Sequence, residues 1–184
     1  MNILLNFDHS LFLLINHLPH TVATDTVALT LSGIGTGGLI WLALSILIFV
    51  RVERREHWFF LPIVLATACS ELFGNWSLKL FFARSRPPLT LGAIFVNSPL
   101  HDYSFPSGHA TFAWALAIVL ASKEPRLKYF YYTLAVLICL SRIYLGYHYP
   151  SDVVAGSLLG VSIGFFSLWV ERNVIFYRIR RKRT

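Results

Sequence analysis

The stretch "SFPSGHATFAWAL", residues 104–116, joins a Pro-Ser-Gly-His turn directly to an apolar run. Proline and glycine mark a turn, and an apolar run of this kind predicts a buried or membrane helix. We therefore predict that a helix begins near Ser107 and carries His109 in its first turn. The histidine needs an explanation, because it lies where the hydrocarbon of a bilayer would begin.

The composition around this stretch indicates an integral membrane protein. The chain has 184 residues, of which 55% are hydrophobic and 14% charged, and its mean hydropathy is +0.60. Soluble domains carry roughly 25% charged residues. The net charge of +7 would suggest nucleic acid in a soluble protein, but in a membrane protein basic residues collect on one side of the bilayer. We predict no nucleic-acid partner.

Apolar runs of about 20 residues define the predicted topology. We expect an all-α integral membrane fold: a bundle of about five transmembrane helices plus an N-terminal interfacial amphipathic helix, in a single domain over residues 1–184. Cys69 and Cys139 lie within apolar runs and are interpreted as packing residues. The interfacial helix is predicted at 1–20, and the spans at 27–50, 58–82, 107–122, 129–144 and 152–170.

Basic residues set the predicted orientation. They follow the first, third and fifth spans, and five spans put these three places on one side, which the positive-inside rule makes cytoplasmic. The C-terminus is then cytoplasmic, and the opposite face is periplasmic or external. The basic residues on the cytoplasmic side are Arg51, Arg54, Arg55, Lys123, Arg126, Lys128 and those of the tail 172–184.

Four basic residues are left on the outer face: Lys79, Arg84, Arg86 and Arg142. Two interpretations compete for them. Their side chains could snorkel and contact lipid headgroups loosely, or they could form a built phosphate site. Charge count alone does not decide between the two.

The spacing of three motifs favours the phosphate site. The first is Lys79 followed after six residues by Arg86-Pro87, and the second is "PSGH" at 106–109. The third is Ser141-Arg142, then His148 after five residues and Asp152 after three more. All three lie at the outer ends of predicted helices, so the bundle can gather them into one pocket.

These residue types suit phosphoryl transfer. Charge develops on three equatorial oxygens in the transition state, so several fixed cations are needed. Lys79, Arg86 and Arg142 supply them, and the planar guanidinium suits bidentate phosphate contact. The backbone N–H groups of Ser107 and Gly108, at a helix N-terminus, also favour an anion.

The histidines supply a candidate nucleophile and a candidate acid. A carboxylate from Asp152 bonded to one ring nitrogen of His148 would leave the other nitrogen free to attack. His109 would then protonate the leaving oxygen. Taken alone, each piece has a structural alternative: a histidine at a helix end is often structural, and Asp152 could simply cap its helix.

In this order the motifs resemble the type 2 phosphatidic acid phosphatases, whose superfamily also includes vanadium haloperoxidases and glucose-6-phosphatase. The family pattern is K-x6-R-P, P-S-G-H and S-R-x5-H-x3-D, and this chain matches every motif position between residues 79 and 152. The helical layout is similar to that of small bacterial members. The resemblance implies a location in the bacterial inner membrane.

The resemblance also implies roles by position. Lys79, Arg86, Ser107, Gly108 and Arg142 would bind phosphate. His148 would form a phosphohistidine, helped by Asp152, with His109 as the acid. No cofactor and no metal are expected.

The substrate expected from the resemblance is a lipid phosphate held within the bilayer. The N-terminal stretch "FDHSLFLLINHLPH" is similar to that of undecaprenyl-diphosphate phosphatases, so undecaprenyl diphosphate ranks first. Lipid A 1-phosphate, phosphatidylglycerophosphate and phosphatidic acid follow. The alternatives are a lipid-to-lipid phosphotransferase on the same scaffold and a non-catalytic lipid-binding member. The sequence does not determine the oligomeric state.

Three sets of residues lie outside the motifs. Glu71 is an acidic residue inside a span and so a functional candidate, but we favour a role in pairing within the bundle. Arg84 could meet the second phosphate of a diphosphate, or snorkel, and we favour snorkelling. His101 and Asp102 could shape the entrance, and we interpret them as part of a solvated loop.

Overall fold

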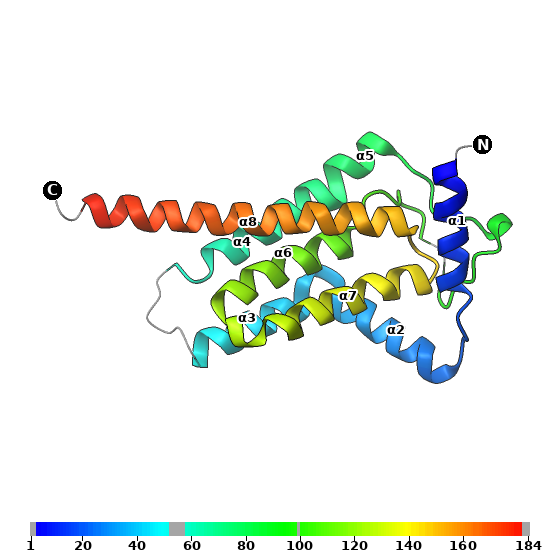
Figure 1. The fold of residues 1–184 in the computed structure, drawn as a ribbon, viewed down its shortest axis with the longest axis horizontal. Helices are drawn as coiled ribbons and strands as arrows, with labels where there is room; N and C mark the ends of the chain where they lie inside the picture. The colour runs from blue at the N-terminus through cyan, green and yellow to red at the C-terminus, as the bar shows by residue number, and fades with distance from the viewer. Residues whose placement is uncertain (1–2, 52–57, 99, 182–184) are drawn as a thin grey trace.

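The computed structural model describes residues 3–51, 58–98 and 100–181, and every regular element among them is helical (Figure 1). The longest helix, α8, runs along the whole bundle, and α1 lies crosswise at one end. The elements are α1 (Ile3–Asn16), α2 (Val22–Gly35), η1 (Thr36–Gly38), α3 (Leu39–Arg51), α4 (Leu61–Cys69), η2 (Ser70–Ser77), α5 (Leu78–Phe82), η3 (Leu89–Leu91), α6 (Gly108–Lys123), η4 (Pro125–Leu127), α7 (Lys128–Tyr144) and α8 (Pro150–Arg181).

The predicted span 27–50 is divided into two helices. α2 and α3 are bent by 64° at the 3-10 turn η1. The sequence "GIGTGG" at 33–38 explains the break, because glycine disfavours a continuous helix and Gly38 has a φ of +72°. The bend brings Thr36 toward the start of α6.

The predicted span 58–82 contains a change of helix type. Between α4 and α5 the chain forms a π-helix, η2, over eight residues. π-helical segments often occur at functional sites. Here η2 carries Glu71 and Asn75, and the Asn75 side chain donates a 2.8 Å hydrogen bond to Glu71 Oε2.

Close packing of α6 on α8 fixes the centre of the bundle. Three glycines at intervals of four residues, Gly156, Gly160 and Gly164, form one stripe of α8 against α6. A Cβ at Gly156 would lie 2.5 Å from the Ser107 carbonyl oxygen, and one at Gly160 would lie 2.4 Å from that of Thr111. Small residues allow this approach in membrane helices. The stripe therefore sets the position of the PSGH turn relative to the start of α8.

One helix of the described residues is long and apolar enough by itself to cross a bilayer. This is α8, over Pro150–Val174, with a mean hydropathy of 2.0, and α2 with α3 pass the same test as a bent pair. α6, with 16 residues, is about 24 Å long, below the roughly 30 Å hydrocarbon thickness. The number of about five spans therefore stays a prediction.

The bundle exposes large apolar side chains on its outside while small and aromatic residues fill its centre. Phe81, Leu158 and Trp169 are each more than half exposed, whereas Trp41 and Tyr131 are fully buried. A lipid-facing surface explains this distribution, since soluble proteins rarely expose so much contiguous apolar area. Among the basic residues used for orientation, Arg54, Arg55, Lys182 and Arg183 lie outside the described residues.

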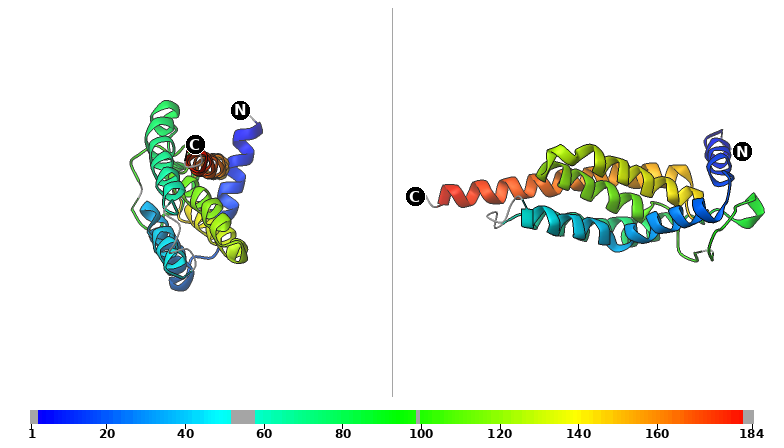
Figure 2. Two further views of the ribbon diagram at one scale, coloured as in Figure 1. Left: turned by 90° about the vertical axis from the view of Figure 1, so that its left-hand side faces the viewer. Right: turned by 90° about the horizontal axis from the view of Figure 1, so that it is seen from below.

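α1 lies across the end of the bundle, beside the long loop after α5 and the turn before α8 (Figures 1 and 2). The buried Asn16 side chain bonds to both backbone groups of Ile94 and to the Tyr144 carbonyl, at 2.8–2.9 Å. These bonds fasten the helix to the loop and to the end of α7. The predicted N-terminal helix is therefore present, and part of its polar face is buried against the bundle.

Candidate active site

The three sequence motifs meet at one end of the bundle. Lys79 lies on α5, and the PSGH turn starts α6. Arg142 lies near the end of α7, and Asp152 in the first turn of α8 (Figure 1). His148 lies in the short turn between α7 and α8. The gathering predicted from the sequence is thus present, and its geometry can be described residue by residue.

His148 is almost completely buried. It is 1% exposed, and its Nε2 lies 3.2 Å from Nη1 of Arg86. Burial lowers the pKa of His148 well below its usual range, and the positive charges of Arg86, Arg142 and Lys79 lower it further. The imidazole is therefore neutral at pH 7, which is the form that can act as a nucleophile.

Asp152 lies behind His148 and is fully buried. Its Oδ2 is 3.6 Å from His148 Nδ1, longer than an ordinary hydrogen bond. The same oxygen accepts from Ser104 Oγ at 2.5 Å and from the Tyr149 N–H at 2.9 Å. The two side chains are therefore adjacent, but the predicted hydrogen bond between them is not formed in this structure. Hydrogen bonds in active sites often tighten only when substrate binds.

His109 lies in the first turn of α6, at the edge of the pocket. Its Nε2 is 3.2 Å from the Thr36 hydroxyl, at the bend between α2 and α3. The charges of Arg142 and Lys79 act on both His109 and His148. The two histidines therefore lie near the same two cations, and their roles as nucleophile and acid stay predictions.

Two of the predicted phosphate-binding cations hold a carboxylate of the protein. Asp102 Oδ2 accepts from Lys79 Nζ at 2.6 Å, and Asp102 Oδ1 accepts from Arg86 at 2.7 and 3.0 Å. Burial alone would raise the pKa of Asp102, but the Lys79 hydrogen bond and the charge of Arg86 lower it to about 2. The interpretation of Asp102 as part of a plain solvated loop was wrong: its side chain is 54% exposed, yet it forms ion pairs with both Lys79 and Arg86.

The third cation, Arg142, is buried between α2 and α7. Its Nη1 donates to the Ser32 hydroxyl, and its guanidinium carbon lies 4.5 Å from the centre of the Tyr147 ring. Tyr147 also accepts from Arg86 through its carbonyl oxygen, at 2.5 Å. Tyr147, the residue before His148, thus contacts both arginines: its carbonyl oxygen accepts from Arg86, and its ring packs against Arg142.

The PSGH turn differs in one respect from the expectation. The Ser107 N–H, predicted to face phosphate, donates to the Asp152 carbonyl at 3.0 Å. The turn is therefore tied to α8, and what Ser107 presents is a fully buried hydroxyl without a partner among the described residues. A Cβ at Gly108 would lie 1.8 Å from Oδ1 of Asn75, so a larger residue there would displace the Asn75 side chain. Glu71 is exposed and accepts a hydrogen bond from Asn75 of the same helix, so its pairing role within the bundle stays a prediction.

The interpretation of Arg84 as a snorkelling side chain was wrong. Its guanidinium turns inward, where Nη1 donates to Asp152 Oδ1 at 2.6 Å and Nη2 donates to Asp8 Oδ2 at 2.7 Å. Asp8 and Asp152 are buried, and a buried carboxylate is costly unless it is paired. Pairing with these two carboxylates therefore holds Arg84 inside the protein instead of at the lipid headgroups. Sequence reasoning missed Asp8 and Ser104, although an acidic residue on an apolar helix was a usable signal for Asp8.

The motifs thus bring a buried histidine and three basic side chains together at one end of an apolar helical bundle, the arrangement that the sequence predicts for a phosphatase of membrane lipids. The sequence profile of the PAP2 superfamily matches residues 58–176. This protein belongs to the PAP2 superfamily and is a hydrolase of a family that works without metal.

Relatives with different lipid substrates match most of the chain. It is 32% identical over 170 residues to the undecaprenyl-diphosphatase of Sulfolobus acidocaldarius, covering 91% of this chain and 80% of the relative. It is 28% identical to the lipid A 4'-phosphatase of Porphyromonas gingivalis, covering 90% and 73%. The crystal structure of Aquifex aeolicus LpxE superposes with a TM-score of 0.74 at 34% identity, covering 86% of this chain and 93% of that one. The chain is therefore a PAP2 lipid phosphatase and an integral membrane protein.

Proposed function

We propose that this protein hydrolyses the phosphate monoester or diphosphate of an envelope lipid, on the outer face of the membrane, through a phosphohistidine at His148. Undecaprenyl diphosphate is the first candidate substrate, and lipid A 1-phosphate and phosphatidylglycerophosphate follow. The single observation that carries the proposal is the 3.2 Å contact between Arg86 Nη1 and Nε2 of the buried His148. It puts a phosphate-binding donor beside the attacking atom.

In this proposal the reaction takes two steps, carried out by the two histidines and the three cations of the site. His148 Nε2 attacks phosphorus and the P–O bond to the lipid breaks, while His109 gives its proton to the leaving oxygen. Water then attacks the phosphohistidine, His109 takes a proton from it, and inorganic phosphate leaves. Lys79, Arg86 and Arg142 stabilise the charge on the equatorial oxygens in both steps.

The outer-face orientation and the five spans belong to the same proposal. The spans would be α2 with α3, α4 through α5, then α6, α7 and α8. Lys123 and Lys128 lie at the end of the bundle opposite the site, and the positive-inside rule then makes the site external. An accessibility assay on single cysteines at Leu100 and Arg126 tests this: reagent outside the cell should label only the first, and labelling of position 126 alone would reverse the orientation.

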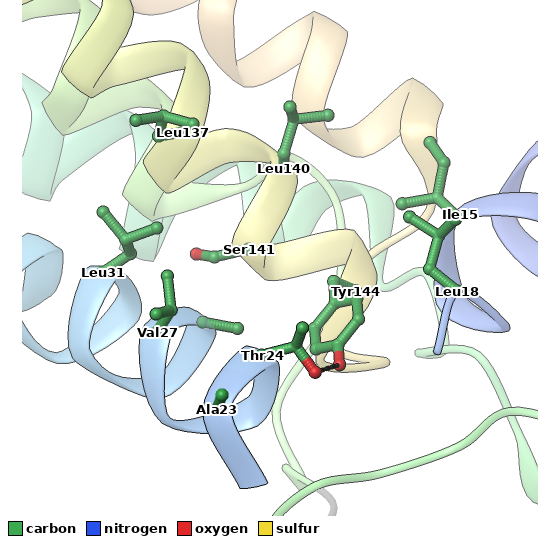
Figure 3. Close-up of a pocket in the computed structure, with 11 residues that line it drawn as sticks. Ile15, Leu18, Ala23, Thr24, Val27, Leu31, Leu137, Leu140, Ser141 and Tyr144 are labelled. Atoms are coloured by element: carbon green, nitrogen blue, oxygen red, sulfur yellow. Dashed lines mark hydrogen bonds between the residues drawn. The ribbon is translucent and has the colours of Figure 1, made fainter. Parts of the chain in front are cut away.

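An apolar groove beside the site supports a lipid substrate. It lies between α2 and α7 at the end of α1, has a volume of about 450 Å³ and is lined by Val27, Leu31, Leu137 and Leu140 (Figure 3). Ser141 also lines it, and the next residue, Arg142, reaches the phosphate site. We assign the groove to the hydrocarbon chain of the substrate. Leu140→Trp should raise KM for a long-chain lipid several-fold and leave a short-chain phosphate unaffected, whereas equal effects on both would contradict the assignment.

A panel of lipids tests the function and orders the substrates. Purified protein in detergent with EDTA should release inorganic phosphate from at least one of undecaprenyl diphosphate, lipid A 1-phosphate, phosphatidylglycerophosphate and phosphatidic acid. The fastest lipid identifies the substrate class. Release that requires an added acceptor lipid would point instead to a phosphotransferase, and no release from folded protein would point to a binding role.

Asp102 should compete with the phosphate of the substrate, because it holds Lys79 and Arg86 in the free protein. Asp102→Asn is expected to lower the inhibition constant of inorganic phosphate several-fold, since the amide no longer neutralises the two cations. The measurement is phosphate inhibition of p-nitrophenyl phosphate hydrolysis. Weaker inhibition in the variant would mean that Asp102 positions the cations instead of competing for them.

A further inference from the structure

Arg84 lies outside the three motifs but contacts the carboxylate behind the nucleophile. Its Nη1 donates to Asp152 Oδ1 at 2.6 Å and to Ser151 Oγ at 2.7 Å, and its guanidinium carbon lies 4.1 Å from the centre of the Tyr149 ring. Asp152 is fully buried. Arg84 therefore bonds Oδ1 of Asp152, while Oδ2 of the same carboxylate is the oxygen near His148.

Asp8 of α1 completes this arrangement. It is 7% exposed and accepts from Arg84 Nη2 at 2.7 Å, from the Ser151 N–H at 2.9 Å and from Ser151 Oγ at 2.5 Å. Asp8 thus holds both Arg84 and the first turn of α8. None of its hydrogen bonds or ion pairs reaches His148, so any effect on the reaction passes through Arg84 or through the first turn of α8, which carries Asp152.

The physical need for this pair follows from burial. An ionised carboxylate in a low-dielectric site is costly unless it is paired and hydrogen-bonded. Ser104 and the Tyr149 N–H bond Oδ2, which is the oxygen nearest His148, and Arg84 bonds Oδ1. Together they satisfy both oxygens and fix the plane of the carboxylate. Asp8 in turn balances the charge of Arg84.

We propose that Arg84 and Asp8 are positioning residues that keep Asp152 ionised and oriented toward His148, so that α1 supports the reaction without touching substrate. The inference rests on the proposed function of His148 and Asp152. It replaces the alternative in which Arg84 binds the second phosphate of a diphosphate, because its guanidinium is already engaged by two carboxylates.

The first test is a split between kcat and KM on two substrates. Arg84→Ala is expected to lower kcat by about 10- to 100-fold with KM changed less than threefold, to the same extent for the monophosphate and the diphosphate of one lipid. Arg84→Lys should recover part of the loss, and Asp8→Asn should lower kcat less than Arg84→Ala does. Arg126→Ala, an exposed arginine on η4, is the matched control. A loss confined to the diphosphate, and seen in KM, would overturn the inference.

A double-mutant cycle separates positioning from a structural role. In an Asp152→Asn background, Arg84→Ala should lower kcat less than threefold further, because the charge that it positions is gone. An equal loss in both backgrounds would overturn the inference. If Asp152→Asn is inactive while Arg84→Ala keeps full kcat, the inference alone fails. If Asp152→Asn keeps full kcat, the proposed function of Asp152 fails as well, and the inference with it.

Discussion

Replacing His148 with alanine is expected to lower kcat for the preferred lipid by about 10⁴-fold or more, the scale on which loss of a covalent nucleophile acts. The reason is structural as well as chemical. His148 is buried beside Arg86, and burial together with the nearby cations keeps its ring neutral. In the proposed reaction no other side chain takes the place of its Nε2. The measurement is initial-rate phosphate release in detergent.

Binding should survive the loss of His148, because the cations stay in place. His148→Ala should therefore bind inorganic phosphate or vanadate with an affinity close to that of the wild type, and its melting temperature in detergent should show that it is folded. Imidazole added at high concentration should restore part of the rate. A folded variant that retains more than a tenth of the wild-type rate would exclude His148 as the nucleophile.

Replacing His109 with alanine should give the second-largest loss, about 10²- to 10⁴-fold in kcat for a lipid monoester. An alkoxide is a poor leaving group, so the proton from His109 matters most for that substrate. With p-nitrophenyl phosphate, whose leaving group is stable without a proton, the loss should be much smaller. The measurement is the ratio of the two rate losses.

The comparison of leaving groups distinguishes an acid from a phosphate-binding residue. If His109 only binds phosphate, His109→Ala should slow both substrates equally and raise KM for both. Thr36→Val removes the hydroxyl 3.2 Å from His109 Nε2. Like His109→Ala, it should slow hydrolysis of the lipid monoester more than that of p-nitrophenyl phosphate, but by a smaller factor. Equal losses of kcat on both substrates would exclude His109 as the general acid.

The sequence predicted the gathering of the three motifs well, because each motif lies at the end of an apolar run and helix ends of a bundle must meet. It did not predict the bend at Thr36–Gly38, for which the glycines of "GIGTGG" were a usable local signal, or the π-helix at Ser70–Ser77, which packs against α6. Nor did it predict that the Ser107 N–H bonds the Asp152 carbonyl, which follows from the close approach of α8 at Gly156.

The side chains that sequence reasoning misjudged are those whose partners lie far away in the chain. Arg84 meets Asp8 across 76 residues and Asp152 across 68, and Asp102 meets Lys79 across 23. No local spacing pattern records such pairs. The long loop between α5 and α6 carries both Arg84 and Asp102 and brings these charges together.

Trapping the covalent intermediate tests the central claim most directly. Wild-type protein would be mixed with the preferred lipid carrying ³²P in its terminal phosphate, quenched within milliseconds in alkali and digested. The account predicts an acid-labile, alkali-stable label on the peptide that contains His148, absent from His148→Ala and formed before phosphate is released. A label on another residue, or phosphate release in a single turnover without any labelled protein, would contradict it.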